Sequence, residues 1–220
     1  RMVARWFDDA AGPLYEATDV DFAPAYVDAF EHESGPDDRS LIRQAAEALA
    51  GGDPAAALSA VAAYIDMVHF RRFWAMTAVL GQFDAFPYSN PGDDYFVYAD
   101  PESARLHFIP WGMDETFYSG SHDVKLVTSV LATTCMEVPS CWDPFVDEVW
   151  QVMDEVDRMD LLGRLDVIAA QIAPHIARDT RKPYTNTRVR TYQENIRWFL
   201  NDRRSSLEEM LGPPDQDLAP

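Results

Sequence analysis

The sequence predicts an α+β fold that is mainly helical and has a central β-hairpin. Several segments of the chain repeat apolar residues at helical spacing. By contrast, the stretch from Asp93 to Phe117 (DDYFVYADPESARLHFIPWGMDETF) has the composition of two short strands joined by a tight turn. A chain of 220 residues is long enough to bury one sizeable core, with room for a small subdomain.

The hairpin is the best-defined element. Its first strand, from Tyr95 to Tyr98, is aromatic and β-branched. The turn residues 100–103 (DPES) place a proline at the second turn position, where its fixed φ angle is favourable. The return strand, from Leu106 to Ile109, is apolar enough to be mostly buried, and Pro110 ends it.

Before the hairpin, the chain is expected to form one short strand and several helices. The strand covers Leu14 to Glu16 and follows a break at Gly12-Pro13. Residues 34–38 (SGPDD) form a linker. An alanine-rich helix then runs from Ser40 to Ala50 and ends at Gly51-Gly52.

The next two helices lead into the core. Asp53-Pro54 begins a second alanine-rich helix, which extends to about Tyr64. The segment from Ile65 to Leu80 (IDMVHFRRFWAMTAVL) is too apolar for an exposed helix. We therefore expect it to cross the core.

After the hairpin, the sequence predicts further helices and then a disordered tail. The last helix has a core-facing stripe of apolar residues at helical spacing. The tail, residues 212–220, is rich in proline and acidic residues, so one domain would cover residues 1–211. These helices are expected near Lys125–Thr134, Pro144–Glu155, Asp160–Arg178 and Thr187–Leu211.

The charge of the chain excludes some classes of partner. The net charge is −19, from 37 acidic and 18 basic residues. Nucleic-acid binding needs clustered cations that displace counterions, so this balance argues against a nucleic-acid partner. It also argues against docking on anionic lipid. No apolar run approaches the ~18 residues that a membrane helix needs, so no membrane insertion is expected.

Two cysteines, Cys135 and Cys141, lie close together in TCMEVPSC. They can close a small disulfide-bonded turn between helices, and two free buried thiols are the equal alternative. A metal site would need further thiols or histidines at suitable spacing. If the cysteines are bonded, they imply an oxidising, extracytoplasmic location.

Acidic residues mark the ends of the hairpin. Asp93-Asp94 opens it, Asp114 follows its second strand, and Asp84 lies just after the apolar helix in GQFDAF. A hairpin brings its two ends together, so Asp94 and Asp114 should be neighbours. Two such carboxylates repel each other unless a cation intervenes, and Mg²⁺ prefers oxygen ligands of this kind. The alternative is that these aspartates only form turns and brace loops.

The commonest catalytic motifs are absent from the sequence. It contains no GxSxG, HExxH, P-loop or GxGxxG pattern. The histidines have no partners at ligand spacing, so we expect them to be structural or on the surface.

The hairpin sequence resembles a known family. YFVYADPESARLHFIPWGMDETF is similar to the characteristic hairpin of the CotH-like spore coat proteins, a group of atypical protein kinases. GQFDAF is similar to an N-W-D-G-Y-type element of this family, and GPLYEATDVDF to its G-N-L-Y-E segment. The cysteine pair and the ending DTRKPYT…FLNDRR also fit, so the resemblance extends from about Gly12 to Leu211.

This resemblance implies a fold and an activity. The fold would be a protein-kinase-like C-terminal lobe, and the activity would be transfer of the ATP γ-phosphate to serine or threonine of a secreted or cell-surface protein. The implied cofactors are Mg²⁺ and ATP. Asp84 would be the catalytic aspartate and Asp114 a metal ligand. Asp94, where the family usually has asparagine, would be a second metal ligand, and Gly112 replaces an aspartate of many members.

The resemblance also implies a missing part. A kinase needs a lysine on a strand of its N-terminal lobe, and neither lysine of this chain lies in such a context. Residues 1–211 would thus be the C-terminal portion of a kinase domain, inactive or weak without the N-terminal lobe, in an extracellular or cell-envelope protein. One alternative is a non-catalytic extracellular or coat binding module. Another is a hydrolase that uses Asp84 and Asp114 as an acid–base pair.

Overall fold

The structure is a computed structural model that describes residues 3–117 and 122–214. Its described residues form seven α-helices and one four-stranded antiparallel sheet, which confirms an α+β, mainly helical class. The strands are β1 (Leu14–Ala17), β2 (Glu31–Ser34), β3 (Tyr95–Asp100) and β4 (Arg105–Pro110). The helices are α1 (Ser40–Leu49), α2 (Pro54–Val61), α3 (Met67–Leu80), α4 (Val130–Met136), α5 (Pro139–Arg158), α6 (Leu161–Arg178) and α7 (Asn186–Leu211). The 3-10 turns are η1 (Val3–Arg5), η2 (Pro24–Ala29) and η3 (Met113–Glu115).

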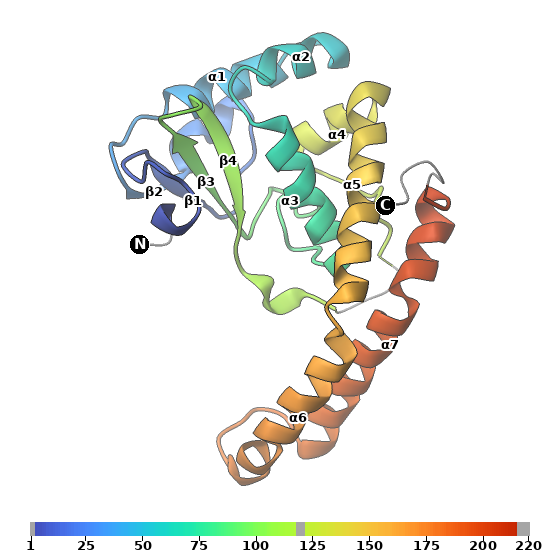
Figure 1. Cartoon of the computed structure of the whole chain (residues 1–220). Coiled ribbons are helices and arrows are strands. Elements are labelled where there is room, and N and C mark those ends of the chain that lie inside the picture. Colours follow the sequence, from blue (N-terminus) through green and yellow to red (C-terminus); the bar gives the residue numbers. More distant parts are fainter. Residues whose placement is uncertain (1–2, 118–121, 215–220) are drawn as a thin grey trace.

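The sheet has the strand order β2-β1-β3-β4. Figure 1 shows it at one side of the molecule, with α1 and α2 along its upper edge and α3 between the sheet and α5. Helices α6 and α7 extend away from this body as an arm. The predicted central hairpin is β3 and β4, which pair from Tyr95 opposite Pro110 to Asp100 opposite Arg105. Its turn is held by the Asp100 carboxylate, which accepts a hydrogen bond from the backbone N–H of Ser103 (3.0 Å).

Strand β1 lies at the predicted position, but the sequence does not predict β2. All four residues of β2 (EHES) are polar and exposed, so no alternation of apolar residues marks it. It forms at the edge of the sheet by antiparallel pairing with β1, with Glu31 opposite Glu16. The linker expected from residue 34 therefore begins at the last residue of a strand.

Side-chain caps set several helix ends. Helix α3 begins after Asp66, whose carboxylate accepts a hydrogen bond from the backbone N–H of His69 (2.9 Å), and it ends at Gly81 in the left-handed conformation. Helix α4 begins after Ser129, which caps its first turn, so the start predicted near Lys125 is wrong.

Helix α5, by contrast, begins earlier than predicted, at Pro139 instead of Pro144. Pro139 occupies the first turn, where a backbone donor is not needed. Pro144 lies inside the helix and costs it one backbone hydrogen bond. Burial of Cys141 and Phe145 in the core holds these first turns in place.

Both faces of the sheet are covered. On one face, Val97 of β3 and Phe108 of β4 belong to a large core shared with Trp74 of α3. On the other face, Phe96 packs in a smaller cluster with Val3 of η1. Strand β3 is therefore buried along its whole length, which makes it a rigid support for the residues at its ends.

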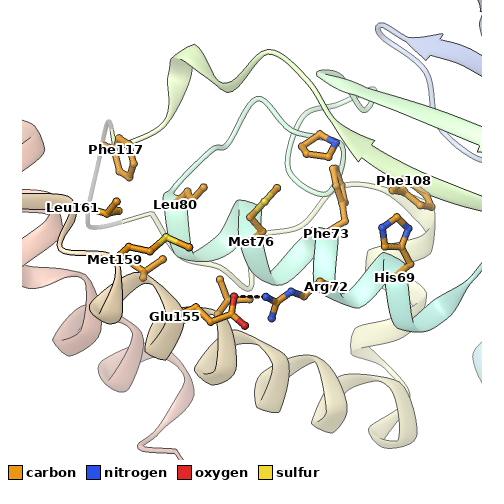
Figure 2. A pocket seen from close by; sticks show the side chains of 13 residues that line it. His69, Arg72, Phe73, Met76, Leu80, Phe108, Phe117, Glu155, Met159 and Leu161 are labelled. Atoms are coloured by element: carbon orange, nitrogen blue, oxygen red, sulfur yellow. Dashed lines mark hydrogen bonds and ion pairs between the residues drawn. The ribbon is translucent and has the colours of Figure 1, made fainter. Parts of the chain in front are cut away.

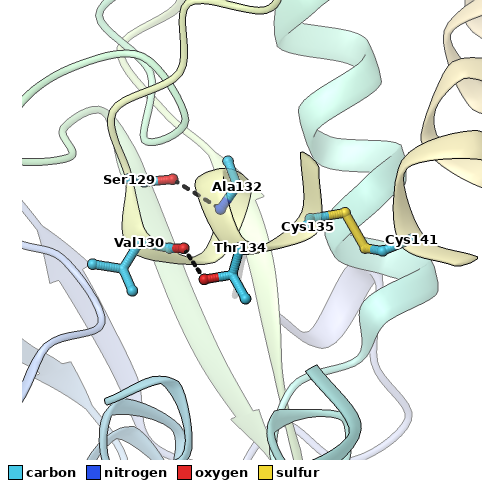
Figure 3. Close-up of a disulfide and its surroundings, with 6 residues drawn as sticks. All are labelled: Ser129, Val130, Ala132, Thr134, Cys135 and Cys141. Atoms are coloured by element: carbon cyan, nitrogen blue, oxygen red, sulfur yellow. Dashed lines mark hydrogen bonds between the residues drawn. A yellow bond between two sulfur atoms is a disulfide. The ribbon is translucent and has the colours of Figure 1, made fainter. Parts of the chain in front are cut away.

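Cys135 and Cys141 form a disulfide, so the alternative of two free thiols is wrong. Figure 3 shows this bond joining α4 to the first turn of α5. Both cysteines are buried in the core.

The arm of α6 and α7 differs from the body in burial and charge. Helix α6 has no buried residue, and Val167 and Ile168 on it are exposed. The second half of α7 returns to the body, where the buried Arg203 donates hydrogen bonds to the carbonyl oxygens of Val79 (3.1 Å) and Ala78 at the end of α3. Residues 161–198 carry seven arginine and lysine residues but three acidic ones.

Within the described ranges, no helix has both the length and the apolar character needed to span a membrane. Residues 215–220 of the tail lie outside the described residues, so the disorder expected there stays a prediction. The domain boundaries expected from the sequence likewise stay a prediction.

Candidate functional site

The two ends of the hairpin meet at a short polar segment, which we call the hairpin mouth (residues 93–94 and 111–115, with residues 82–84). Asp94 directly precedes β3, and its backbone carbonyl accepts a hydrogen bond from the backbone N–H of Trp111, just after β4 (3.1 Å). Asp114 follows in η3. The pairing of β3 with β4 therefore fixes where Asp94 lies relative to the segment that carries Asp114.

Gly112 allows the close approach of these two ends. Its φ angle is +54°, in the left-handed region that favours glycine. A Cβ atom at this position would overlap the Asp94 carboxylate. A larger residue at position 112 would not fit this arrangement, because Asp94 occupies the space that its side chain would need.

Gln82 ties the mouth together, and sequence analysis did not identify it. Its side chain is buried, and Nε2 donates hydrogen bonds to the carbonyl oxygens of Trp111 (3.1 Å) and Gly112 (3.0 Å). Nε2 also lies 3.5 Å from Asp94 Oδ2. The other amide atom, Oε1, is buried without a hydrogen-bond partner among the described residues. One feature of the sequence could have identified Gln82: it is a polar residue directly after the glycine that caps an apolar helix.

The charges at the mouth act on Asp94 together. Burial is the main cause that raises the pKa of Asp94 to about 6. The negative charges of Asp93, Asp84 and Asp114 raise this pKa further. The three predicted site residues therefore share one electrostatic neighbourhood, although they come from three separate parts of the chain.

The carboxylates do not form a closed metal cage. Asp84 and Asp114 are exposed, whereas Asp94 is half-buried. Among the described residues, the acidic groups whose oxygens all lie within 4.8 Å of one another are instead Glu16, Glu31 and Glu33 at the edge of the sheet. That group is largely exposed, and repulsion from its two neighbours adds to the desolvation that raises the pKa of Glu16.

The residues at the mouth nevertheless fit a magnesium ion. They offer only oxygen ligands, from the aspartates and from the unpartnered Oε1 of Gln82. Mg²⁺ prefers such ligands and commonly takes one or two carboxylates together with phosphate oxygens. A bound cation would also offset the repulsion that raises the pKa of Asp94. The lysines offer no phosphate contact here, because Lys125 donates to the Met210 carbonyl oxygen, and Lys182 donates to two carbonyl oxygens at the end of α6, one in its last turn and one just after it.

Two cavities lie between β4 of the hairpin and the helices. One of about 420 Å³ is mostly apolar and lies between α3, β4 and α5. Figure 2 shows Leu80 and Phe117 at one end of it and His69 at the other, with the ion pair of Arg72 and Glu155 across it. The second, of about 890 Å³, shares His69 and Arg72 with the first. None of the three predicted site aspartates lines either cavity.

Comparison with known proteins identifies the family of the chain. The family model described as CotH kinase protein matches residues 15–207, which include most of β1, all elements from η2 to α6, and most of α7. A search of curated proteins finds none that matches the chain. Because the family model covers most of the chain and includes Asp84, Asp94 and Asp114, this protein belongs to the CotH kinase family.

Proposed function

We propose that the chain is the C-terminal lobe of a CotH-like protein kinase. The reaction would be Mg²⁺-dependent transfer of the ATP γ-phosphate to a serine or threonine hydroxyl of a secreted or cell-surface protein. The observation that carries this proposal is the gathering of Asp84, Asp94 and Asp114 at the hairpin mouth, where burial, and after it the charges of the neighbouring aspartates, raise the pKa of Asp94. Phosphoryl transfer depends mainly on positioning and on charge stabilisation, which such a site can supply with a cation.

Each aspartate has a role in this proposal. Asp94 and Asp114 hold Mg²⁺, with the Oε1 atom of Gln82 as a further oxygen ligand. Mg²⁺, when bound, neutralises the charge of the ATP phosphates. The exposed Asp84 orients the acceptor hydroxyl and accepts its proton. Its exposure suits this role, because a protein substrate must be able to reach it.

The proposal includes a second lobe and a location. Since both lysines of the chain make hydrogen bonds away from the mouth, the phosphate-binding lysine belongs to an N-terminal lobe. The chain would then have little or no activity without that lobe. The disulfide supports an extracellular or cell-envelope location, because such bonds persist in oxidising compartments.

Substitutions in the full-length protein test the catalytic roles. Asp84→Ala and Asp114→Ala should each reduce phosphate transfer from ATP to protein by about 10²-fold or more, because each removes a group that acts on the transferred phosphoryl or the acceptor. Transfer is measured with γ-labelled ATP. Both residues are exposed, so thermal unfolding should stay close to wild type.

Asp28→Asn is the matched control, because Asp28 is an exposed aspartate of η2 far from the mouth in sequence, and its loss should leave transfer unchanged. If either alanine variant retains wild-type transfer, that residue has no part in the mechanism.

Titration with Mg²⁺–ATP addresses the non-catalytic alternative. If the full-length protein shows no saturable binding, the fold serves as a scaffold or binding module instead.

A further inference from the structure

Two histidines that are distant in sequence meet beside the larger cavity. His69 lies on α3 and His107 on β4, and their Nδ1 atoms are 3.2 Å apart. Sequence spacing does not reveal this contact, because the two histidines lie 38 residues apart. One Nδ1 atom must donate a proton to the other, so the two rings share one proton between these nitrogens.

The second nitrogen of His107 is also fixed. Its Nε2 atom lies 3.1 Å from the Ser103 hydroxyl and 3.8 Å from a carboxylate oxygen of Asp100. The nearby carboxylate favours a proton on Nε2, which leaves the lone pair of His107 on Nδ1. In metal sites, a hydrogen bond to the second ring nitrogen commonly orients the ligating histidine in this way.

Both rings are neutral near pH 7. Burial lowers the pKa of His69 and of His107, and the neighbouring ring lowers that of His69 further. Asp66 offsets part of this effect, because its charge raises the pKa of both histidines. For His107, Asp100 also raises the pKa and Arg105 lowers it. A neutral imidazole is the form that binds metals.

We propose that His69 and His107 form a site for a transition-metal ion at the wall of the larger cavity. Both side chains line this cavity, so an ion can reach them from it. If a metal ion lies about 2.0–2.1 Å from each Nδ1 atom, the N–metal–N angle is about 100°, between the octahedral and tetrahedral values. The rings need only rotate so that their lone pairs converge on the cavity, while the proton on Nδ1 of His69 moves to its Nε2 by exchange with water.

Charges around the pair also favour a cation. Asp66 lines the same cavity beside both rings and can add a carboxylate oxygen. Arg72 lines it as well, but its positive charge is offset by ion pairs with Glu148 (2.7 Å) and Glu155. Among the described residues, no third ligating group lies within 4.8 Å of both histidines, so water completes the coordination unless Asp66 turns toward the ion.

The donor set selects the class of metal. Imidazole nitrogens suit Zn²⁺, Co²⁺, Ni²⁺ and Cu²⁺, whereas Mg²⁺ prefers oxygen ligands. The pair is thus distinct in chemistry from the aspartates of the hairpin mouth. The proposal does not depend on phosphate transfer.

Titration of the metal-free protein with Zn²⁺ and Co²⁺, in excess Mg²⁺ to occupy oxygen sites, tests this inference. We expect one saturable site by calorimetry and visible absorption bands of nitrogen-coordinated Co²⁺. His69→Gln and His107→Gln should each weaken binding about tenfold or more, and Ser103→Ala should weaken it less, through the lost orientation of His107. His175→Gln, at an exposed histidine of α6, is the control and should bind as wild type.

Three outcomes would overturn the proposal: no saturable Zn²⁺ binding, wild-type affinity in both histidine variants, or loss of binding in a Glu16/Glu31/Glu33→Gln variant alone. If a histidine variant fails to fold, as judged by circular dichroism, Cu²⁺ bound to wild-type protein decides the question. Its electron paramagnetic resonance spectrum should then show coupling to two imidazole nitrogens, and a spectrum with oxygen ligands alone would reject the site.

Discussion

Gly112 is the residue that sets the spacing of the hairpin mouth. Its left-handed φ angle and its contact with the Asp94 carboxylate leave no room for a side chain. Gly112→Ala should therefore lower the free energy of unfolding by about 1–3 kcal/mol, because a non-glycine residue is strained at this angle and must displace Asp94. Urea unfolding measures the change.

Gly52→Ala is the matched control, because a Cβ atom at Gly52 meets nothing within 4 Å and its φ angle is not in the left-handed region. Its free energy of unfolding should stay within about 0.5 kcal/mol of wild type. Equal stability of the two variants would contradict the packing described for Gly112.

Asp94 makes the stability of the protein depend on pH. Its pKa of about 6 in the folded protein lies above the unfolded value of about 3.9, so the folded state binds more protons between these values. The free energy of unfolding should therefore decrease as pH rises from about 4 to about 6. Asp94→Asn removes this effect. Because the carboxylate is partly exposed, we expect the variant to be more stable than wild type by only about 1 kcal/mol above pH 7.

The gain in the free energy of unfolding from Asp94→Asn should disappear near pH 4, because there the wild-type carboxyl is protonated and carries no charge. Urea unfolding at the two pH values measures it. Added Mg²⁺ should stabilise the wild type more than the variant, since the variant lacks one carboxylate ligand. If the variant is less stable than wild type above pH 7, the ionised Asp94 carboxylate does not destabilise the folded protein, and the account of its environment is wrong.

At the scale of elements, Arg203 connects α7 to the end of α3. It is buried, and burial lowers its pKa to about 10. Arg203→Met keeps much of the apolar stem but removes the donors to the carbonyl oxygens of Ala78 and Val79. We expect a loss of about 2–3 kcal/mol in the free energy of unfolding, because these hydrogen bonds involve a charged donor and their acceptors stay buried.

The control for this change is Arg190→Met, at an exposed arginine of the same helix, which should be nearly neutral. Amide hydrogen exchange adds a local measurement, since α7 should exchange faster in Arg203→Met while β3 stays protected. Unchanged exchange in α7 would mean that other contacts, such as those of the buried Phe199 and Leu207, hold the helix without Arg203.

At the scale of the whole molecule, local sequence signals account for most of the fold. The hairpin, the helices and the end of α3 at Gly81 were predictable, because turn residues, caps and apolar spacing act over a few residues. Strand β2 was not, since its polar residues become a strand only by pairing with β1. The early start of α5 depends on core packing of its first turns, which the residues near Pro139 do not reveal.

The site was less predictable than the fold. The acidic residues at both ends of the hairpin pointed to the mouth, because a hairpin necessarily joins its ends. The role of Gln82 and the fit of Gly112 against Asp94 could not be foreseen, since both depend on contacts across about 12 to 30 residues of chain. The pair of His69 and His107 is a contact of the same kind, between a helix and a strand.

The net charge of −19 should make stability depend on salt. Mutual repulsion of like charges opposes the compact state, and salt screens it over a Debye length that falls from about 30 Å at 0.01 M to about 8 Å at 0.15 M. The free energy of unfolding should therefore rise between these two NaCl concentrations. Urea unfolding measures it, and sodium sulfate at equal ionic strength separates screening from preferential exclusion of the salt. If the free energy of unfolding stays constant or falls as NaCl is added, local ion pairing has already relieved the repulsion between like charges.

The arm of α6 and α7 gives this acidic molecule a positive end. Residues 161–198 have more cations than anions, whereas the rest of the chain holds the remaining 34 of 37 acidic residues and 11 of 18 basic ones. Because the arm extends away from the body, these opposite charges are separated in space, and the molecule has a large electric dipole moment. A negative electrostatic potential would repel the body and attract the arm, so it would orient the molecule with the arm foremost even though the net charge opposes binding.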